Sequence, residues 1–188
     1  MLIQHVEQVT APHVFPIPAV PAGSGDGGGC GRNDLPPGFG PILVVPRQRK
    51  LGLGYGGKIM GFHPVRPGHG SVPYESPLER DLLPLLGGMH CLIKIRAQPV
   101  TIHFYYRGQR FRYTPDFWVW LAAVPPGLAA LGVSNTRFFV EVKPTGRLEA
   151  CQQDLDIKFM ALRFGTGLST TICTEVEIRN RPGEYFYE

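Results

Sequence analysis

The sequence predicts an α/β protein in which helices flank a central mixed β-sheet, with an extended Gly/Pro-rich arm at the N-terminus. Three observations support this prediction. After residue 74 the apolar pattern changes between helical and strand periodicity, in the order helix, strands, helix, strand. The first 46 residues contain glycine and proline runs such as "AGSGDGGGCG" and "DLPPGFGP". A composition of 43% hydrophobic and 11% aromatic residues still provides enough apolar surface for one folded core.

The N-terminal part of the chain divides into two segments of different composition. Residues 1–46 are expected to form a flexible arm, because glycine costs backbone entropy and proline removes donors, so little regular structure should form before about residue 40. Residues 47–73 are a basic segment within a stretch, Leu35 to Tyr74, that has no acidic residue. Its basic residues are Arg47, Arg49, Lys50, Lys58 and Arg66. The segment is either a solvated surface loop or a DNA-contacting region.

Arginine outnumbers lysine by 14 to 5 in a chain of net charge +4. A guanidinium donates two parallel hydrogen bonds to a phosphate, so this composition favours a phosphate-bearing partner. A second candidate DNA footprint, beside the basic segment, consists of Arg107, Arg110 and Arg112 in an expected hairpin.

A helix is expected to begin after Ser76, at the start of a folded core that we place at residues 74–178. Ser76 can cap the helix, Pro77 suits its first turn, and Glu79 stands at the position of a capping-box partner. The leucines at 78, 82, 83 and 86 supply an apolar stripe, and a Gly-Gly pair at 87–88 ends it.

The remainder of the core is predicted to be mainly strands, followed by a C-terminal tail at residues 179–188. We expect strands at 92–96 and 100–106, a turn at 107–109, a long strand running on through 117–121, a loop at 124–134, a strand at 136–143, an amphipathic helix at 147–164 and a last strand at 169–173. The uncharged span 117–136 is interrupted by Pro125 and Pro126, so it is interpreted as strand and loop and not as a membrane helix.

Two acids and one lysine are expected to meet at the ends of two strands. Asp116 follows Pro115 and directly precedes the strand that begins at Phe117. In "FFVEVKP", strand alternation places Glu141 and Lys143 on one face and the flanking valines on the other. If the two strands are neighbours, this set suits Mg²⁺, which binds one or two carboxylates together with water and phosphate oxygens and can activate water. Lys143 could act as a base or stabilise developing charge.

Each of these residues also has a purely structural interpretation. Asp116 could close a turn with its own backbone, and Glu141 and Lys143 could form a cross-strand ion pair. The capping-box position explains Glu79 without any metal. The histidines and the four cysteines show no metal-ligand spacing, and the cysteines are interpreted as reduced thiols of a cytosolic protein.

The ordered motifs "YESPLERDLL", "QPVTIHFYYRGQRFRYTPDFWV" and "FFVEVKP" resemble the TnsA-type endonuclease subunit of heteromeric transposases. The resemblance covers roughly residues 47–178 and implies a restriction-endonuclease-like core of the PD-(D/E)xK superfamily. It implies that Glu79, Asp116 and Glu141 are catalytic metal ligands and that Lys143 is catalytic. Gln98 belongs to a Gln-Pro dipeptide that matches a family signature, and it would support the site.

The resemblance also implies an activity and partners. It implies Mg²⁺-dependent hydrolysis of one DNA strand at a transposon end, with Mn²⁺ as a substitute. The expected partners are double-stranded DNA, an integrase-like transposase subunit and an AAA+ ATPase regulator, with no membrane, in the bacterial cytoplasm at the nucleoid. No counterpart is expected here for the C-terminal helical domain of longer family members. Two other functions stay open: a stand-alone restriction or repair nuclease, and an inactive nuclease-like module that binds DNA or proteins.

Overall fold

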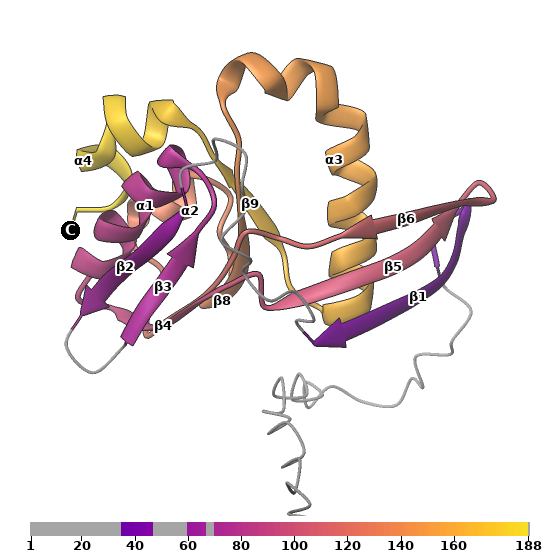
Figure 1. Ribbon diagram of the computed structural model, residues 1–188, viewed down its shortest axis with the longest axis horizontal. Coiled ribbons are helices and arrows are strands. Elements are labelled where there is room, and N and C mark those ends of the chain that lie inside the picture. Colours follow the sequence, from indigo (N-terminus) through magenta and orange to yellow (C-terminus); the bar gives the residue numbers. More distant parts are fainter. Residues whose placement is uncertain (1–34, 47–59, 67–69, 188) are drawn as a thin grey trace, which may run out of the picture. The chain divides into compact units, whose positions relative to one another are not determined.

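The computed structural model describes residues 35–46, 60–66 and 70–187 (Figure 1). The strands are β1 (Phe39–Pro46), β2 (Gly61–Arg66), β3 (Gly70–Tyr74), β4 (Leu92–Ala97), β5 (Val100–Tyr106), β6 (Gln109–Tyr113), β7 (Phe117–Leu121), β8 (Arg137–Val142) and β9 (Thr170–Cys173). The helices are α1 (Pro77–Gly88), α2 (Pro126–Ala130), α3 (Thr145–Thr166) and α4 (Pro182–Tyr185), with a short π-helix, η1 (Val176–Asn180). The chain is therefore a mixed α/β protein, as predicted.

A four-stranded sheet in the order β4-β7-β8-β9 carries the main core. The pairs β4–β7 and β7–β8 are antiparallel, whereas β8–β9 is parallel, which confirms the prediction of a mixed sheet. A parallel pair needs a crossover connection, and α3 supplies it. Strand β8 is buried from its second residue to its last, because it lies between two strands and both of its faces are covered.

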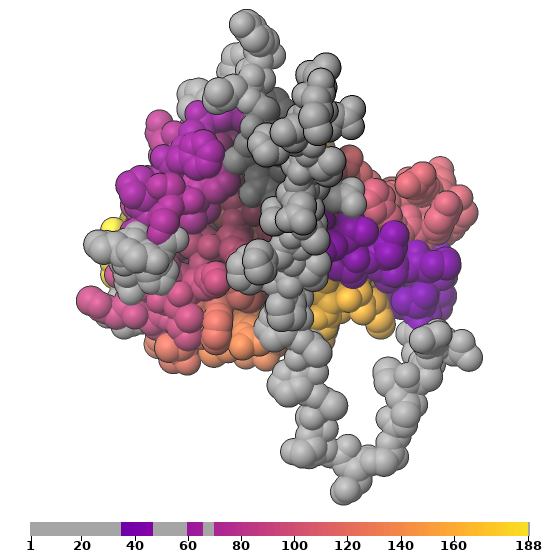
Figure 2. Space-filling view, turned by 60° about the horizontal axis from the view of Figure 1, so that its bottom comes forward, coloured from indigo at the N-terminus to yellow at the C-terminus, as the bar shows by residue number. Residues whose placement is uncertain are grey.

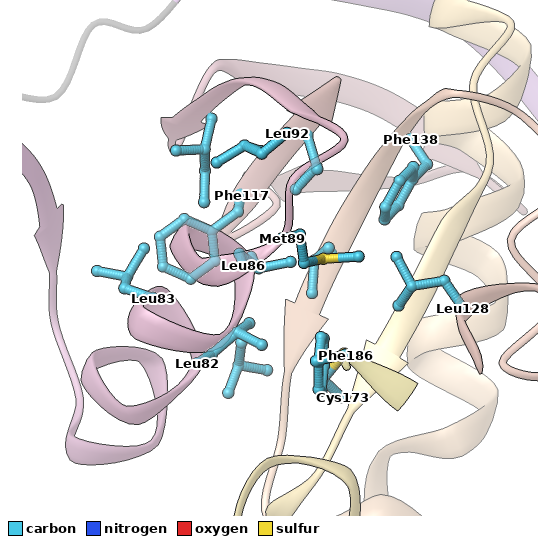
Figure 3. Close-up of a cluster of buried hydrophobic side chains, with 14 of the residues drawn as sticks. Leu82, Leu83, Leu86, Met89, Leu92, Phe117, Leu128, Phe138, Cys173 and Phe186 are labelled. Atoms are coloured by element: carbon cyan, nitrogen blue, oxygen red, sulfur yellow. The ribbon is translucent and has the colours of Figure 1, made fainter. Parts of the chain in front are cut away.

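Helix α1 packs its leucine stripe against one face of this sheet. Its start is as predicted, because the Ser76 hydroxyl accepts a hydrogen bond from the Glu79 N–H at 3.1 Å and Pro77 occupies the first turn. Leu82 and Leu83 are completely buried. The labelled members of this main core in Figure 3 are Leu82, Leu83, Leu86, Met89, Leu92, Phe117, Leu128, Phe138, Cys173 and Phe186.

A second sheet, in the order β1-β5-β6, packs against α3 (Figure 1). Strand β5 pairs antiparallel with both of its neighbours. Its alternate residues Ile102 and Phe104 are buried together with Leu162 of α3 in a second apolar cluster. The contact is close, since a Cβ added at Gly165 of α3 would lie 2.7 Å from Cγ2 of Val44 in β1. The predicted helix at 147–164 is thus confirmed, and its apolar side faces this sheet.

The predicted long strand from the hairpin turn to Leu121 is wrong. The chain leaves β6 at Tyr113 and begins β7 at Phe117, and these two strands belong to different sheets. Pro115 lies in the break, where its missing N–H removes a donor that a continuous ladder would need. The expected loop at 124–134 contains the short helix α2. Within the described ranges, no helix is both long and apolar enough to cross a membrane.

The folded region also extends beyond both predicted limits. Residues 39–46, which we assigned to the arm, form β1, because β5 offers them an edge with which to pair. Part of the basic segment forms the hairpin of β2 and β3. In the predicted C-terminal tail, Phe186 belongs to the main core. A Cβ added at Gly127 would lie 2.4 Å from the Glu184 carbonyl oxygen, so the tail packs directly on α2. Residues 1–34 lie outside the described part of the chain.

Replacing Phe186 tests whether the tail is part of the core. The ring is 2% exposed, whereas the neighbouring Tyr187 is 63% exposed. We expect Phe186→Ala to lower the free energy of unfolding by about 3–5 kcal/mol, the usual cost of emptying a buried aromatic site, and to lower Tm by roughly 2–4 °C for each kcal/mol. Tyr187→Ala is the control and should change Tm little. Similar melting temperatures for the two variants would show that the tail does not contribute to the core.

Candidate functional site

The pairing of β7 with β8 brings Asp116 next to Glu141. The antiparallel register sets Phe117 opposite Val140, so Asp116, one residue earlier, stands level with Glu141. The Val142 N–H donates a hydrogen bond of 2.8 Å to Asp116 Oδ2, so the carboxylate extends the ladder beyond the first residue of β7. The two strands are therefore neighbours, as predicted, and Asp116 binds the backbone of β8 and does not close a turn of its own.

Glu141 is 3% exposed, and both of its carboxylate oxygens have partners. Oε1 lies 2.8 Å from Lys143 Nζ, and Oε2 accepts a hydrogen bond of 2.7 Å from the Tyr113 hydroxyl. The ion pair joins Glu141 of β8 to Lys143, the residue just after the strand, on the same side as alternation predicted, and it does not run between strands. These partners are needed, because an uncompensated buried charge costs on the order of several kcal/mol.

Lys143 and Tyr113 keep their protons in this environment. Burial disfavours the charged form of Lys143, but the negative charge and hydrogen bond of Glu141 outweigh it, so the pKa of the ammonium lies above its ordinary value. Burial, with the charge of Glu141, raises the pKa of the Tyr113 phenol well above its ordinary value. Both shifts favour the protonated forms, so beside Glu141 Lys143 is a cation and Tyr113 is a hydrogen-bond donor.

Sequence reasoning missed Tyr113. Its position near the end of a strand, three residues before Asp116, was visible in the sequence. Its partner Glu141 is 28 residues away and lies in the other sheet. No local pattern links the two residues, because the contact depends on how the chain turns between β6 and β7.

Glu79 caps its own helix and also belongs to an acidic group that it forms with Asp116 and Glu141. Oε2 accepts a hydrogen bond of 2.8 Å from the Glu75 N–H, and Oε1 accepts one of 2.9 Å from the Ser76 hydroxyl. The capping interpretation is confirmed, except that the backbone donor is the residue before the cap. Burial raises the pKa of Glu79, and the charges of Glu75 and Glu141 add to this effect, against the opposing influence of the two hydrogen bonds.

A cleft of about 830 Å³ opens where β8 leads into α3. Its charged lining residues are Glu75, Glu79, Asp116, Lys143, Arg147, Glu175 and Arg179. Glu141 is not among the lining residues and reaches the cleft through its ion pair with Lys143. Acids and bases therefore line the same opening, which suits a ligand that brings both a cation and phosphate groups.

The C-terminal segment holds one side of the cleft in place. Glu175 Oε2 accepts a hydrogen bond of 2.9 Å from the Thr145 N–H at the start of α3. Arg179 donates to Asp81 Oδ2 of α1 from Nε at 2.9 Å and from Nη2 at 2.6 Å. These contacts tie α1 and the start of α3 to one segment. The sequence prediction placed Arg179 in the tail, outside the core, and no local pattern links Glu175 to Thr145, which is 30 residues away.

Gln98 holds the backbone at Asp116. Its N–H donates a hydrogen bond of 2.7 Å to the Asp116 carbonyl oxygen. Its φ of 45° lies in the left-handed region, which costs a non-glycine residue roughly 1–3 kcal/mol. The side chain is buried, and its Oε1 has no hydrogen-bond partner within the described part of the chain. The hydrogen bond from the Gln98 N–H to the Asp116 carbonyl oxygen is a contact that a residue supporting Asp116 would make.

The positive charge and hydrogen-bond donors around Asp116 do not fully offset the repulsion from Glu79 and Glu141. Burial, together with repulsion from Glu141 and Glu79, raises the pKa of Asp116 well above its ordinary value, and the Val142 N–H and Lys143 offset only part of this effect. Asp116 Oδ2 accepts the hydrogen bond from the Val142 N–H.

The donors at this site fit a hard cation better than a soft one. Among the residues described, no three His, Cys, Asp or Glu side chains are arranged to hold a metal ion by themselves. Mg²⁺ needs only one or two protein carboxylates, and its other ligands are water and substrate oxygens. The cleft lining includes carboxylates and no described histidine or cysteine. The described Cys151 and Cys173 are free thiols.

The predicted DNA-binding residues are only partly described. Arg110 and Arg112 are exposed on β6, and Arg66 is the last residue of β2. Four others lie outside the described residues, namely Arg47, Arg49, Lys50 and Lys58. The role of the basic segment therefore stays a prediction.

Comparison with known proteins identifies no family for this chain. No protein-family model matches it, and a search of curated proteins finds no match. The resemblance to TnsA-type endonucleases therefore depends on the quoted motifs alone.

Asp116→Asn tests whether the acids repel one another in the folded protein. Asparagine keeps the shape and an acceptor for the Val142 N–H but removes the charge. Because the folded-state pKa of Asp116 is raised, its ionised form destabilises the fold above that pKa. In EDTA at about pH 8 the variant should melt above the wild type, by roughly 2–4 °C for each kcal/mol of repulsion removed.

This advantage should shrink as the pH falls, because the folded wild type then takes up a proton at Asp116 and regains the lost stability. The regain should be complete below the ordinary pKa of aspartate. Thermal melts over a range of pH measure the difference, and Asp156→Asn on the exposed side of α3 is the matched control. An Asp116→Asn variant that is less stable than wild type at every pH would contradict the repulsion.

Proposed function

We propose that this chain is a metal-dependent endonuclease that hydrolyses a phosphodiester bond of DNA. The observation that supports the proposal is the meeting of Asp116 with the Glu141–Lys143 pair, from neighbouring strands, at one cleft. Two acids and a lysine at the ends of adjacent strands provide ligands for a cation and a positive charge for a phosphate. The finer assignment to a restriction-endonuclease-like fold is part of the same proposal.

In this proposal each charged residue has a separate role. Asp116 and Glu141 would hold Mg²⁺, or Mn²⁺ in its place, with Glu79 as a third carboxylate. When bound, the ion would supply Lewis acidity, which would activate water and neutralise negative charge that develops on the phosphate oxygens. Lys143, as a cation, stabilises negative charge on the phosphate or on the leaving oxygen. Tyr113 holds Glu141 in one orientation through its hydrogen bond, and Gln98 holds the backbone of Asp116.

The motif resemblance supports a more specific proposal for the biological reaction. The chain would be the TnsA-type subunit of a heteromeric transposase and would cut one strand at a transposon end. Its partners would be an integrase-like transposase subunit and an AAA+ ATPase regulator, acting on DNA in the bacterial cytoplasm. Genes for both partners beside this one would favour transposition, and their absence would favour a stand-alone restriction or repair nuclease.

One observation favours a second candidate, an inactive nuclease-like module that binds DNA or proteins. Protein donors occupy both oxygens of Glu79 and both oxygens of Glu141. A cation could bind Glu141 only by displacing or sharing one of these partners. If these hydrogen bonds are permanent, the cleft would bind without cutting.

The first test is cleavage by Asp116→Asn. We expect the variant to cut duplex DNA at least about a hundredfold more slowly than wild type in Mg²⁺ or Mn²⁺, because it loses a ligand charge. Added Mg²⁺ should raise the Tm of the wild type, since a ligand that binds only the folded state stabilises it. It should not raise the Tm of Asp116→Asn.

Asp156→Asn again serves as the matched control and should behave as wild type in both assays. Nicking of supercoiled plasmid measures cleavage, with the partner subunits added where their genes are found. Equal cleavage by Asp116→Asn and wild type would rule out this site. DNA binding by a wild type that neither cuts nor responds to Mg²⁺ would favour the inactive module.

A second test separates the two roles of Glu79. In Glu79→Gln the amide can still accept from the Glu75 N–H and donate to Ser76 Oγ, so the cap should persist. We expect cleavage to fall more than about tenfold while Tm stays near the wild-type value. Ser76→Ala is the counterpart, because it removes the cap, at a cost of about 1 kcal/mol, but keeps the carboxylate. Full activity in Glu79→Gln would leave Glu79 as a cap alone.

A further inference from the structure

One face of the β1-β5-β6 sheet is not used by the apolar cores. Residues that point toward α3, such as Ile102, Phe104 and Tyr113, are buried in the second cluster. On the opposite face, Tyr105 is 46% exposed and Leu43 is 59% exposed. Figure 2 shows β1 and the β5–β6 hairpin side by side at one edge of the view, as their pairing requires.

This sheet carries positive charge and no negative charge. The three strands contain no aspartate or glutamate. Arg110 and Arg112 lie on the exposed face of β6, two positions apart and on the same side as Tyr105, with which Arg110 pairs. Neither arginine has a carboxylate partner among the described residues. By contrast, Arg80, Arg179 and Arg181 all pair with acids elsewhere in the protein.

The hairpin presents these arginines on a rigid support. Its two-residue turn has positive φ at both positions, 48° at Arg107 and 79° at Gly108, which matches the twist of a tight type I′ hairpin. The Arg107 guanidinium carbon lies 5.4 Å from the centre of the Tyr106 ring. The Cα atoms of Arg110 and Arg112 lie about 7 Å apart, since a strand rises about 3.4 Å per residue.

The hairpin is also joined directly to the proposed active site. Arg112 is followed by Tyr113, which binds Glu141. The next residue, Thr114, forms a side-chain hydrogen bond of 2.7 Å with Thr101 of β5, and Asp116 comes two residues later. Four residues span at most about 14 Å. The Cα atoms of Arg112 and Asp116 therefore lie no more than about 14 Å apart, and the hairpin leads directly into the cleft lining at Asp116.

We propose that the exposed face of the β5–β6 hairpin, formed by Tyr105, Arg110 and Arg112, binds the phosphate backbone of double-stranded DNA and positions it for the cleft. This inference rests on the proposed function for its substrate. Guanidinium groups without acid partners bind phosphates through paired hydrogen bonds. Such contacts fix the position of a duplex without reading its sequence, so the face acts on all sequences alike.

The experiment compares two double variants in DNA binding. Affinity for a short duplex is measured over a range of salt concentrations, in EDTA so that no cleavage occurs. For Arg110→Ala with Arg112→Ala, the slope of log affinity against log salt should flatten by about 1.8, because each lost phosphate contact removes about 0.9. The change should be the same on unrelated sequences. Arg163→Ala with Arg181→Ala removes equal charge from exposed positions elsewhere and should leave the slope close to wild type.

A further pair of measurements keeps this inference separate from the proposed nuclease activity. Melting curves should show both double variants folded, since exposed substitutions usually change stability little, and Arg110→Gln with Arg112→Gln repeats the test with longer side chains. An unchanged slope, or an equal loss in the Arg163/Arg181 variant, overturns the hairpin contact even if the wild type cuts DNA. If Arg110→Ala with Arg112→Ala flattens the slope but the wild type never cuts DNA, the hairpin contact is supported and the nuclease is refuted. A wild type that binds no DNA overturns both.

Discussion

In the pairing of β7 with β8, Phe117 stands opposite Val140, and this register sets Asp116 level with Glu141. A slip of one residue would turn Glu141 toward the leucines of α1 and would expose the valines of β8 to Tyr113. Burial of each large apolar side chain contributes about 1.5–3 kcal/mol. The apolar core on the α1 side therefore holds the carboxylates in position more strongly than their own hydrogen bonds do.

The change of sheet at Pro115 brings residues of both sheets to the site. Because the chain changes sheets between β6 and β7, Tyr113 comes from one sheet and Asp116 precedes a strand of the other. The Tyr113–Glu141 hydrogen bond then joins the two sheets at the point where they diverge. Helix α3 begins beside the cleft and continues along the second sheet. The same helix thus links the strand that carries Glu141 to the arginine-bearing hairpin.

The site combines groups that a purely structural arrangement would keep apart. Glu79, Asp116 and Glu141 repel one another, while Lys143 and hydrogen-bond donors offset only part of that repulsion. Natural proteins retain such local conflicts mainly where function requires them. Under the proposed function, a bound cation would relieve the repulsion, so the same acids that repel one another would bind the ion.

The sequence by itself determined the features that depend on near neighbours in the chain. The Ser76 cap, the alternation that pairs Glu141 with Lys143, and the helical period of α3 all follow from spacings of a few residues. The choice of Asp116 followed from its place before an apolar strand. Only the tertiary structure decided the separation of β6 from β7, the addition of β1 to the second sheet, the burial of Phe186 and the partnership of Tyr113 with Glu141. Each of these depends on contacts between distant parts of the chain, which local periodicity does not encode.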